Sequence, residues 1–292
     1  MKKIIVTGCN GQLGRAIGQL YADKTEYELV NTDVCDGEGI TKLDITNVDQ
    51  VLSFAREVKP YAIFNCAAFT NVDGCETNEE AACRINAIGP RNLSIAATET
   101  GAKLIHISTD YVFPGTSERP LTEFDQPAPI SAYGRTKYAG EQMVQQFADR
   151  FFILRTAWLY GDGKNFVKTM LGLSEKMDTL NVVCDQFGNP TAATELAKAM
   201  AFLADTDNYG IFHATCEGSC SWADFTDEIM RLAGKNVTVN HITSKQYKEM
   251  FPQSADRPHY SMLDNYMFRL TSDFRFADWH DAIASYMKEL NK

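Results

Sequence analysis

Short apolar runs alternate with amphipathic stretches along the first 160 residues of the chain. The apolar runs predict buried strands over residues 2–8, 27–33, 61–68, 103–110 and 151–161. Apolar residues at helical spacing predict helices between them, over residues 12–23, 48–60, 78–101 and 131–149. Strands that alternate with helices are typical of a parallel sheet covered on both faces, so we predict a doubly wound α/β fold.

The alternation becomes less regular after about residue 160. Helical patterns cover residues 165–176, 194–205 and 221–234, and strand-like runs cover residues 180–186 and 210–215. No Gly/Ser-rich linker, low-complexity segment or internal repeat separates this part from the first. We therefore predict a first domain over residues 1–157, to which strands and helices near 180–215 return, and a smaller interwoven C-terminal lobe over residues 158–292.

Composition and charge narrow the class of protein. The 292 residues are 45% hydrophobic and 23% charged, as in globular proteins. A net charge of -10 without a dense Lys/Arg run argues against nucleic acid as a partner. No apolar run approaches the roughly 20 residues that span a bilayer, and the start lacks the apolar region of a signal peptide. The eight cysteines form no CxxC pair, so we expect reduced thiols, no zinc and a cytoplasmic protein.

A glycine-rich turn joins the first predicted strand to the first predicted helix. The segment TGCNGQLG contains Gly8, Gly11 and Gly14. Glycines there permit a tight turn and let backbone N–H groups approach a pyrophosphate, and the helix N-terminus adds favourable partial charge. Because the triplet follows a strand and opens a helix, it indicates a Rossmann-type dinucleotide-binding domain rather than a merely structural turn.

Acidic and small residues at the next strand ends are candidates for contact with the dinucleotide. Asp33 lies about 20 residues after the glycines, where an acid can bond a ribose hydroxyl, with a solvated loop acid as the alternative. Asp44 is a candidate for the adenine side, with a capping role as the alternative. No arginine follows Asp33 to hold a 2′-phosphate, which favours NADH over NADPH. Ala67 and Ala68 are small enough for the cofactor to lie against their backbone.

Four polar residues are candidates for the chemistry. Thr109 and Asp110 end the fourth strand, and doubly wound sheets bind ligands at the carboxyl ends of their strands. Tyr133 and Lys137 lie four residues apart on the next helix and therefore share a face. We expect Lys137 and a positive nicotinamide to lower the phenol pKa from about 10 toward 7, and Thr109 to hydrogen-bond the reacting oxygen. A surface Tyr–Lys pair is the alternative, which the glycine turn makes less favoured.

These motifs carry a family resemblance. TGxxGxxG, NCAA, ISTDYVF and YGRTK together resemble an extended short-chain dehydrogenase/reductase. With AAFTNVDGCE, TAWLYG, NFVKTML, DQFGNPT and RPHYSMLDN, the chain resembles the dTDP-4-dehydrorhamnose reductase family over essentially its full length. The resemblance implies NAD(P)H-dependent reduction of the C4 ketone of dTDP-4-dehydro-L-rhamnose to dTDP-L-rhamnose, a polysaccharide precursor.

The resemblance also implies a role for each matching residue. Tyr133 matches the proton donor, Lys137 its partner and Thr109 the third catalytic position, with Asp110 beside it at the substrate. The candidate cofactor contacts are Gly8, Gly11, Gln12, Leu13, Gly14, Asp33, Asp44, Ile45, Ala67, Ala68, Phe69, Thr70, Tyr133 and Lys137. The implied substrate contacts, besides Thr109 and Asp110, are Val72, Trp158 and Arg257, and an ordinary surface arginine is the alternative for the last of these.

Local departures from relatives sharpen this expectation. Related dehydratases carry an Asp-Glu pair after the threonine, whereas Tyr111 follows Asp110 here, so dehydration is disfavoured. Some family members hold Mg²⁺ across a dimer with a glutamate just after the last glycine. In this chain, Arg15 and Ala16 follow the last glycine in place of that glutamate. Glu195 matches a second position that the family uses for Mg²⁺. We therefore expect no bound metal, and a monomer and a homodimer both stay open.

Two other functions also stay open. One is a reductase of different stereochemistry, which would make a C4 epimer such as a 6-deoxytalose. The other is a regulatory subunit of methionine adenosyltransferase, which resembles these reductases and binds cofactor but acts through a partner protein. Such subunits have a leader before the first strand, and the strand here begins at residue 3, which favours the enzyme.

Overall fold

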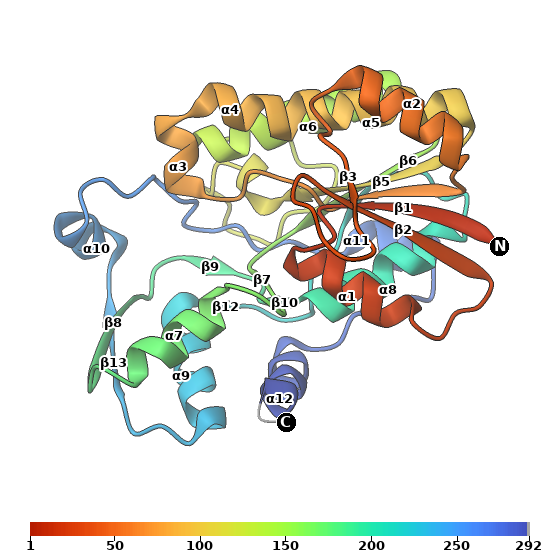
Figure 1. The fold of residues 1–292 in the computed structure, drawn as a ribbon. Coiled ribbons are helices and arrows are strands. Elements are labelled where there is room, and N and C mark those ends of the chain that lie inside the picture. The colour runs from red at the N-terminus through yellow and green to blue at the C-terminus, as the bar shows by residue number, and fades with distance from the viewer. Residues whose placement is uncertain (291–292) are drawn as a thin grey trace.

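A seven-stranded parallel sheet forms the centre of the computed structural model, which describes residues 1–290 (Figure 1). The strand order is β11-β6-β5-β4-β1-β2-β3, and all neighbouring strands are parallel. The strands are β1 (Lys2–Thr7), β2 (Tyr27–Asp33), β3 (Thr41–Lys42), β4 (Ala62–Asn65), β5 (Lys103–Thr109), β6 (Phe151–Thr156) and β11 (Gly210–His213). The predicted doubly wound α/β fold is confirmed.

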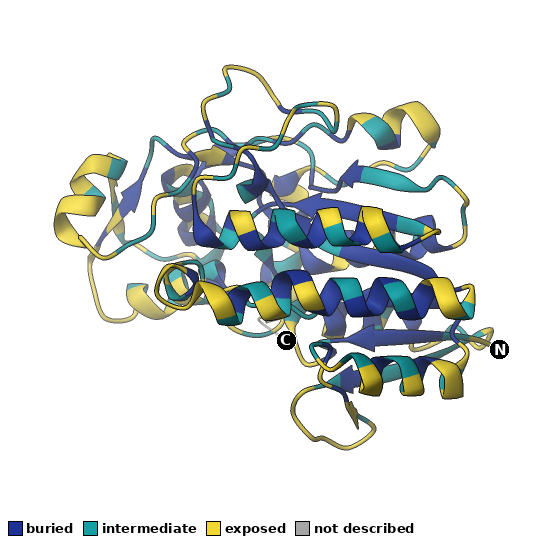
Figure 2. Ribbon diagram, turned by 90° about the horizontal axis from the view of Figure 1, so that it is seen from above, coloured by how far each residue is buried: buried dark blue, intermediate teal, exposed yellow. Residues whose placement is uncertain are grey.

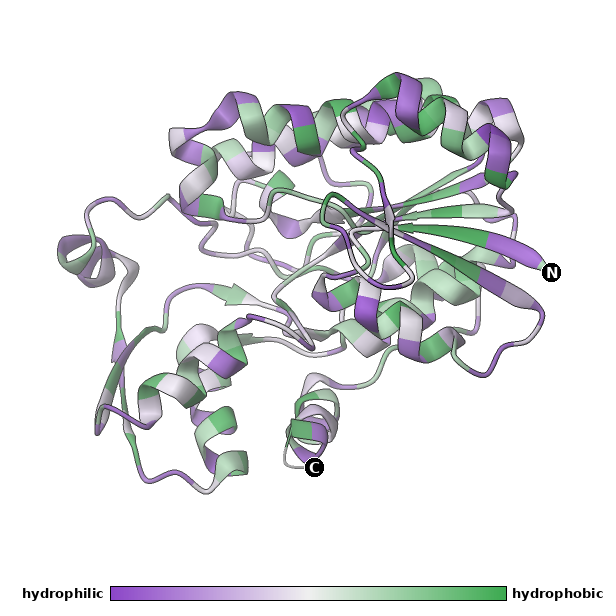
Figure 3. Cartoon of the chain, viewed as in Figure 1, coloured by the Kyte–Doolittle hydropathy of each residue, from purple (hydrophilic) through white to green (hydrophobic). Residues whose placement is uncertain are grey.

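Helices cover both faces of this sheet, as Figure 1 shows. One face carries α2 (Val48–Val58), α5 (Gly89–Thr100) and α6 (Ala132–Phe147). The other carries α1 (Gln12–Tyr21), α8 (Ala193–Ala204) and α11 (Tyr266–Thr271). The central strands β1, β4, β5 and β6 are mostly buried between these layers (Figure 2), which explains why their sequences are rich in apolar residues. The helices alternate apolar and polar positions (Figure 3), as expected when only one side of a helix packs on the sheet.

The long helix predicted over residues 78–101 is interrupted. The segment contains α4 (Glu79–Cys83), a π-helical turn over Arg84–Ile88 and then α5, after a short α3 (Val72–Thr77). Pro90 lacks the N–H that an unbroken α-helix would use to bond residue 86, so the wider turn accommodates it. The turn buries Asn86, whose side chain accepts a hydrogen bond from the Phe69 N–H at 2.8 Å.

The strand predicted over residues 151–161 is also interrupted. β6 ends at Thr156, and β7 (Leu159–Tyr160) pairs with β10 (Thr191–Ala192) outside the central sheet. Trp158 lies between them with φ +47°, a left-handed conformation that is uncommon for a bulky residue. This break turns the chain from the sheet into the C-terminal lobe.

The lobe has its own hydrophobic core, built around Phe225, Ile229, Trp279 and Ile283. Its elements are α7 (Phe166–Ser174), β8 (Thr179–Val183), β9 (Phe187–Gly188), β12 (Cys220–Ser221), α9 (Trp222–Ala233), β13 (Thr238–Ile242), α10 (Ser244–Met250) and α12 (Trp279–Leu290). β8 pairs with β13 and therefore belongs to the lobe, not to the central sheet. The chain returns to the central sheet from residue 193, where α8 covers one face and β11 pairs with β6. Within residues 1–290, none of the helices is both long and apolar enough to cross a bilayer.

Candidate active site

A cavity of about 1040 Å³ lies at the carboxyl ends of the parallel strands. Residues that end β1, β2, β4 and β5 line it on the sheet side, and Trp158 and Trp222 line it on the lobe side. The volume lies at the upper end of the roughly 300–1,000 Å³ that small-molecule sites occupy. One cavity therefore joins the predicted cofactor and substrate positions.

The glycine turn forms one end of this cavity, which we call the cofactor end because the sequence predicts that the cofactor binds there. Gly8 has φ +64°, and the Gly11 N–H donates to the Gly8 carbonyl at 3.0 Å, so the turn exposes the N-terminus of α1. Gly8, Gly11, Gln12 and Leu13 line the cavity, whereas Gly14 does not. A Cβ on Gly14 would lie 2.5 Å from the Cys9 Cα, so this glycine allows the helix to pack against the turn.

Asp33 and Asp44 also line the cavity, with different local contacts. The Asp33 carboxylate accepts hydrogen bonds from the N–H of Asn10 at 3.2 Å and of Cys35 at 3.3 Å, which fix it at the end of β2. Asp44 accepts hydrogen bonds from the N–H and the hydroxyl of Thr46, at 2.9 and 2.8 Å. Asp44 therefore caps the local turn before α2, and it does so while facing the cavity beside Ile45.

The segment after β4 contributes small residues to the cavity wall. Ala67, Ala68, Thr70 and Val72 line the cavity, but Phe69 does not. The Phe69 ring packs instead into a small cluster of Cys75, Ala82, Ala132 and Tyr133. Its backbone N–H and carbonyl are both bonded by the Asn86 side chain, at 2.8 and 3.1 Å. Sequence reasoning missed Asn86, and its place in a helical pattern gave no signal of this role.

The four predicted catalytic residues lie together in the middle of the cavity wall. Thr109 Oγ1 donates to Asp110 Oδ1 at 2.9 Å, and the buried Ser261 hydroxyl donates to Asp110 Oδ2 at 2.5 Å. Tyr133 and Lys137 project from the first turns of α6, and Lys137 Nζ donates to the Ile107 carbonyl at 2.5 Å. Ser261 comes from the C-terminal segment, 151 residues after Asp110, and sequence analysis did not identify this contact.

The pKa of the Tyr133 phenol differs from the sequence-based expectation. Burial raises this pKa, whereas the sequence predicts that Lys137 and a bound nicotinamide together lower it. Burial also lowers the pKa of Lys137 to about 8 and raises that of Asp110 to about 6. The lysine directs its ammonium to a backbone carbonyl, so the desolvated phenol keeps its proton at neutral pH. A protonated phenol is the form that a proton donor requires.

Arg257 does not line the cavity, unlike the other predicted substrate residues. Its guanidinium Nη2 contacts Asp73 Oδ1 at 3.2 Å, and the Ala255 N–H donates to the same carboxylate at 2.8 Å. These contacts join the C-terminal segment to α3, next to Val72. Trp222 is a cavity-lining residue that sequence reasoning missed, because its helical pattern indicated only a packed helix face.

The geometry agrees with comparisons to known proteins. A family model described as the RmlD substrate binding domain matches residues 1–292. The chain belongs to this family. A dTDP-4-dehydrorhamnose reductase from Aggregatibacter actinomycetemcomitans is 36% identical over 97% of each chain. The resemblance predicted from the sequence motifs is confirmed.

Two solved structures of dTDP-4-dehydrorhamnose reductases superpose closely on this chain. A dTDP-4-dehydrorhamnose reductase from Clostridium acetobutylicum is 48% identical, with a TM-score of 0.93, covering 99% of this chain and all of its own. A dTDP-4-dehydrorhamnose reductase from Bacillus anthracis, solved in complex with NADP, is 39% identical with a TM-score of 0.91 and the same coverage.

Two positions that the resemblance associates with a Mg²⁺ site have partners within this chain. Arg15 Nη1 contacts Asp162 Oδ2 at 2.9 Å. Glu195 accepts a hydrogen bond from Lys198 Nζ at 2.5 Å and another from the Ala277 N–H at 3.2 Å. Both side chains are therefore engaged in contacts within one chain.

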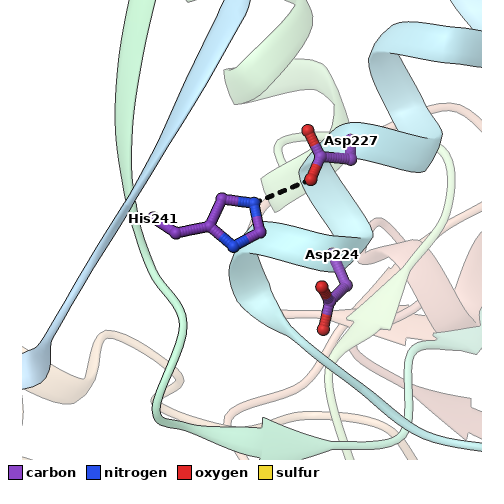
Figure 4. Close-up of side chains that lie close together, drawn as sticks. All are labelled: Asp224, Asp227 and His241. Carbon is purple, nitrogen blue, oxygen red and sulfur yellow. Dashed lines mark hydrogen bonds and ion pairs between the residues drawn. The ribbon is translucent and has the colours of Figure 1, made fainter.

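The surface of the lobe carries a cluster of two carboxylates and one imidazole, outside the cavity lining (Figure 4). Its members are Asp224, Asp227 and His241. His241 Nε2 and Asp227 Oδ2 form a pair at 2.8 Å, with Asp224 nearby. Asp224 also forms a capping box with Ser221 at the start of α9. Each of the three side chains therefore has a hydrogen-bond partner within the lobe.

Proposed function

We propose that this chain reduces the C4 ketone of dTDP-4-dehydro-L-rhamnose with NAD(P)H and forms dTDP-L-rhamnose. The observation that carries the proposal is that Thr109, Tyr133 and Lys137 share one cavity with the glycine turn. The names of the family's relatives support the substrate assignment. Residues 1–157 serve the cofactor in this proposal, and residues 158–292 mainly serve the sugar nucleotide.

The residues at the glycine turn fit a dinucleotide. The glycine turn lets a pyrophosphate approach the start of α1, where Gln12 and Leu13 line the cavity and the helix N-terminus adds partial positive charge. Asp33 is held by two backbone N–H groups with its carboxylate on the cavity wall, where it can accept from a ribose hydroxyl. The bound reduced nicotinamide supplies the hydride for the reaction.

The protein's own residues supply the proton and hold the reacting oxygen. Tyr133 keeps its proton at neutral pH and gives it to the C4 oxygen, so that the ketone becomes an alcohol. The Lys137 ammonium lies one helical turn further along α6 and stabilises the phenolate that remains. Thr109 is oriented through Asp110 and aligns the substrate oxygen beside the phenol. Charge develops on that oxygen, so groups fixed around it contribute most to the rate.

The decisive experiment compares Tyr133→Phe with Tyr138→Phe in a turnover assay with the dTDP-4-keto sugar and no partner protein. Both tyrosines lie on α6, but Tyr138 is not among the cavity-lining residues. We expect Tyr133→Phe to lower kcat by about 10²–10⁴-fold, the range for a lost general acid, and Tyr138→Phe to retain activity. Equal turnover by Tyr133→Phe and wild type would exclude the assignment. A wild type that binds cofactor but turns over no keto sugar would favour a regulatory role.

The configuration of the product is tested in the same reaction. NMR of the sugar nucleotide distinguishes dTDP-L-rhamnose from the C4 epimer of the 6-deoxytalose type. We expect the rhamnose configuration, in agreement with the names of the relatives. A C4 epimer as the main product would keep the reductase assignment and change the substrate face that receives the hydride.

We also propose that NADH is preferred over NADPH. A 2′-phosphate would lie next to the fixed Asp33 carboxylate, and Val34 and Cys35, which follow it, carry no positive charge. Asp33→Ala removes the repulsion between the carboxylate and the 2′-phosphate. The ratio of kcat/KM with NADH to kcat/KM with NADPH should therefore fall by about tenfold. A wild-type preference for NADPH would contradict this part of the proposal.

We further infer a cytoplasmic enzyme that works as a monomer or homodimer. Eight free cysteines, of which one is exposed and three are partly buried, support a reducing compartment. Cell fractionation and light scattering of the purified chain would test these two points.

A further inference from the structure

The lobe side of the cavity carries a stacked pair of indoles. The rings of Trp158 and Trp222 are parallel within 9°, with centroids 3.5 Å apart, and both residues line the cavity. Trp158 lies between β6 and β7, whereas Trp222 is the first residue of α9. Two distant segments of the lobe therefore meet at one aromatic contact on the cavity wall.

The Trp158 indole is held from several directions. Its backbone has φ +47°, a costly conformation for a bulky residue that persists only when its surroundings enforce it. A Cβ on Gly188 would lie 2.6 Å from the Trp158 ring, so β9 approaches the indole as closely as a glycine permits. Phe166 packs against Trp222 with centroids 4.4 Å apart and supports the pair from α7. The stack has one well-defined arrangement.

We propose that Trp222 is a positioning residue that fixes the Trp158 indole as a flat wall for the sugar ring of the nucleotide sugar. This inference rests on the proposed function, in which Trp158 contacts the sugar. Without Trp222, the strained backbone of Trp158 can relax and the indole can leave the orientation that the sugar requires. Trp222 then affects the binding of the sugar, while the glycine turn and the Tyr133 proton donor stay unchanged.

The test uses Trp222→Leu and Trp222→Phe, with Trp279→Phe as a matched control. Trp279 is a tryptophan of the same lobe that packs on Phe225 and is absent from the cavity lining. Stacked indoles give an exciton couplet in circular dichroism, which should disappear in Trp222→Leu and persist in Trp279→Phe. This measurement reports on the stack independently of activity, and Trp222→Phe keeps an aromatic ring in place if the leucine variant folds poorly.

Calorimetry with dTDP and dTDP-L-rhamnose separates the sugar from the nucleotide. We expect Trp222→Leu to weaken binding of dTDP-L-rhamnose, and to raise KM for the keto sugar, by about tenfold, while dTDP and NADH affinities change less than about twofold. Trp222→Phe should show a smaller change in the same direction, because a phenyl ring covers less of the indole face.

Four outcomes would overturn the inference. Unchanged dTDP-L-rhamnose affinity in a variant that has lost the couplet would show that the stack is only packing. An equal loss for dTDP would assign the stack to the base rather than the sugar. If Trp222→Leu binds and reduces the keto sugar as well as wild type, this inference alone is wrong. If wild type has no affinity for dTDP, both this inference and the proposed function are wrong.

Discussion

Two glycines show how differently the two ends of the cavity are built. At the cofactor end, the position that a Cβ would take on Gly14 lies 2.5–2.7 Å from three backbone atoms of Cys9. At the sugar end, the corresponding position on Gly188 lies 2.6–2.9 Å from the Trp158 side chain. The first end is shaped by backbone against backbone, and the second by backbone against an aromatic ring.

This difference explains how far each end can be inferred from sequence. A backbone turn depends on a few residues close together in the chain, so the spacing of Gly8, Gly11 and Gly14 is sufficient to predict it. An aromatic wall depends on contacts among segments far apart in the chain, which a local pattern does not contain. Substitutions that disturb one end and spare the other test this distinction.

The largest effect is expected for Gly14→Ala. The new Cβ meets backbone atoms that cannot move without opening the turn, so we expect a loss of about 5 kcal/mol in the free energy of unfolding, the upper end for one substitution. NADH binding, measured by fluorescence titration, should be lost at the same time. Gly18→Ala is the control, because it lies on the same helix with no atom within 4 Å of its Cβ position. That control should be neutral or slightly stabilising.

A second large effect is expected for the buried ion pair next to Lys137. Glu141 lies one turn after Lys137 on α6 and forms two hydrogen bonds to Arg155, at 2.9 and 2.7 Å. The side chains of Glu141 and Arg155 are 0% and 2% exposed, so Glu141→Gln leaves a buried guanidinium without its counter-charge. We expect urea unfolding to show a loss of about 4 kcal/mol.

The exposed pair of Glu99 and Arg56 provides the comparison for that prediction. Their side chains are 40% and 58% exposed, so Glu99→Gln should lower the free energy of unfolding far less than Glu141→Gln does. Similar losses for Glu141→Gln and Glu99→Gln would mean that burial does not control the strength of the inner pair.

The buried Asp110 carboxyl, which lies on the cavity wall between the two ends, gives a pH-dependent prediction. Burial raises the pKa of Asp110 from 3.8 to about 6, so the folded state holds this proton more tightly than the unfolded state. The contribution of this proton to the free energy of unfolding is fully present below pH 3.8 and is lost as pH rises through about 6. Asp110→Asn lacks this titration, so its stability relative to wild type should increase by about 3 kcal/mol between pH 3.5 and pH 7.5.

Urea unfolding of both proteins at the two pH values measures this change. Other groups titrate equally in wild type and Asp110→Asn, so they cancel in the difference between the two proteins. A difference that stays constant with pH would mean that the folded environment leaves the Asp110 carboxyl unperturbed.

The sequence predicts the fold and the cofactor end better than the sugar end. Alternating strands and helices predicted the sheet, and short motifs predicted Gly8, Asp33, Thr109 and Tyr133, which all line the cavity. The directions in which side chains point were not predictable. Phe69 turns into a neighbouring apolar cluster because its backbone is held by a residue on a π-helical turn that no local pattern indicates.

Contacts across long stretches of chain account for the other residues that were missed. Ser261 bonds Asp110 across 151 residues, and Trp222 meets Trp158 only after α9 and β7 have been brought together. Burial, which no local pattern contains, raises the pKa of the Tyr133 phenol, in the opposite direction to the shift predicted from Lys137 and a bound nicotinamide.

The smallest predicted effect tests the sugar end in the same chemical way as Gly14→Ala tests the cofactor end. Gly188→Ala directs a methyl group at the Trp158 indole, a side chain that can shift where a backbone cannot, so we expect a loss of only about 1–2 kcal/mol in the free energy of unfolding. KM for the keto sugar should rise, while NADH affinity stays unchanged. Gly172→Ala is the control, because it lies in α7 of the same lobe with open space at its Cβ position. It should change neither the free energy of unfolding nor KM for the keto sugar. If Gly188→Ala abolished folding as Gly14→Ala is expected to do, the indole would be as immovable as backbone, and the contrast between the two ends would disappear.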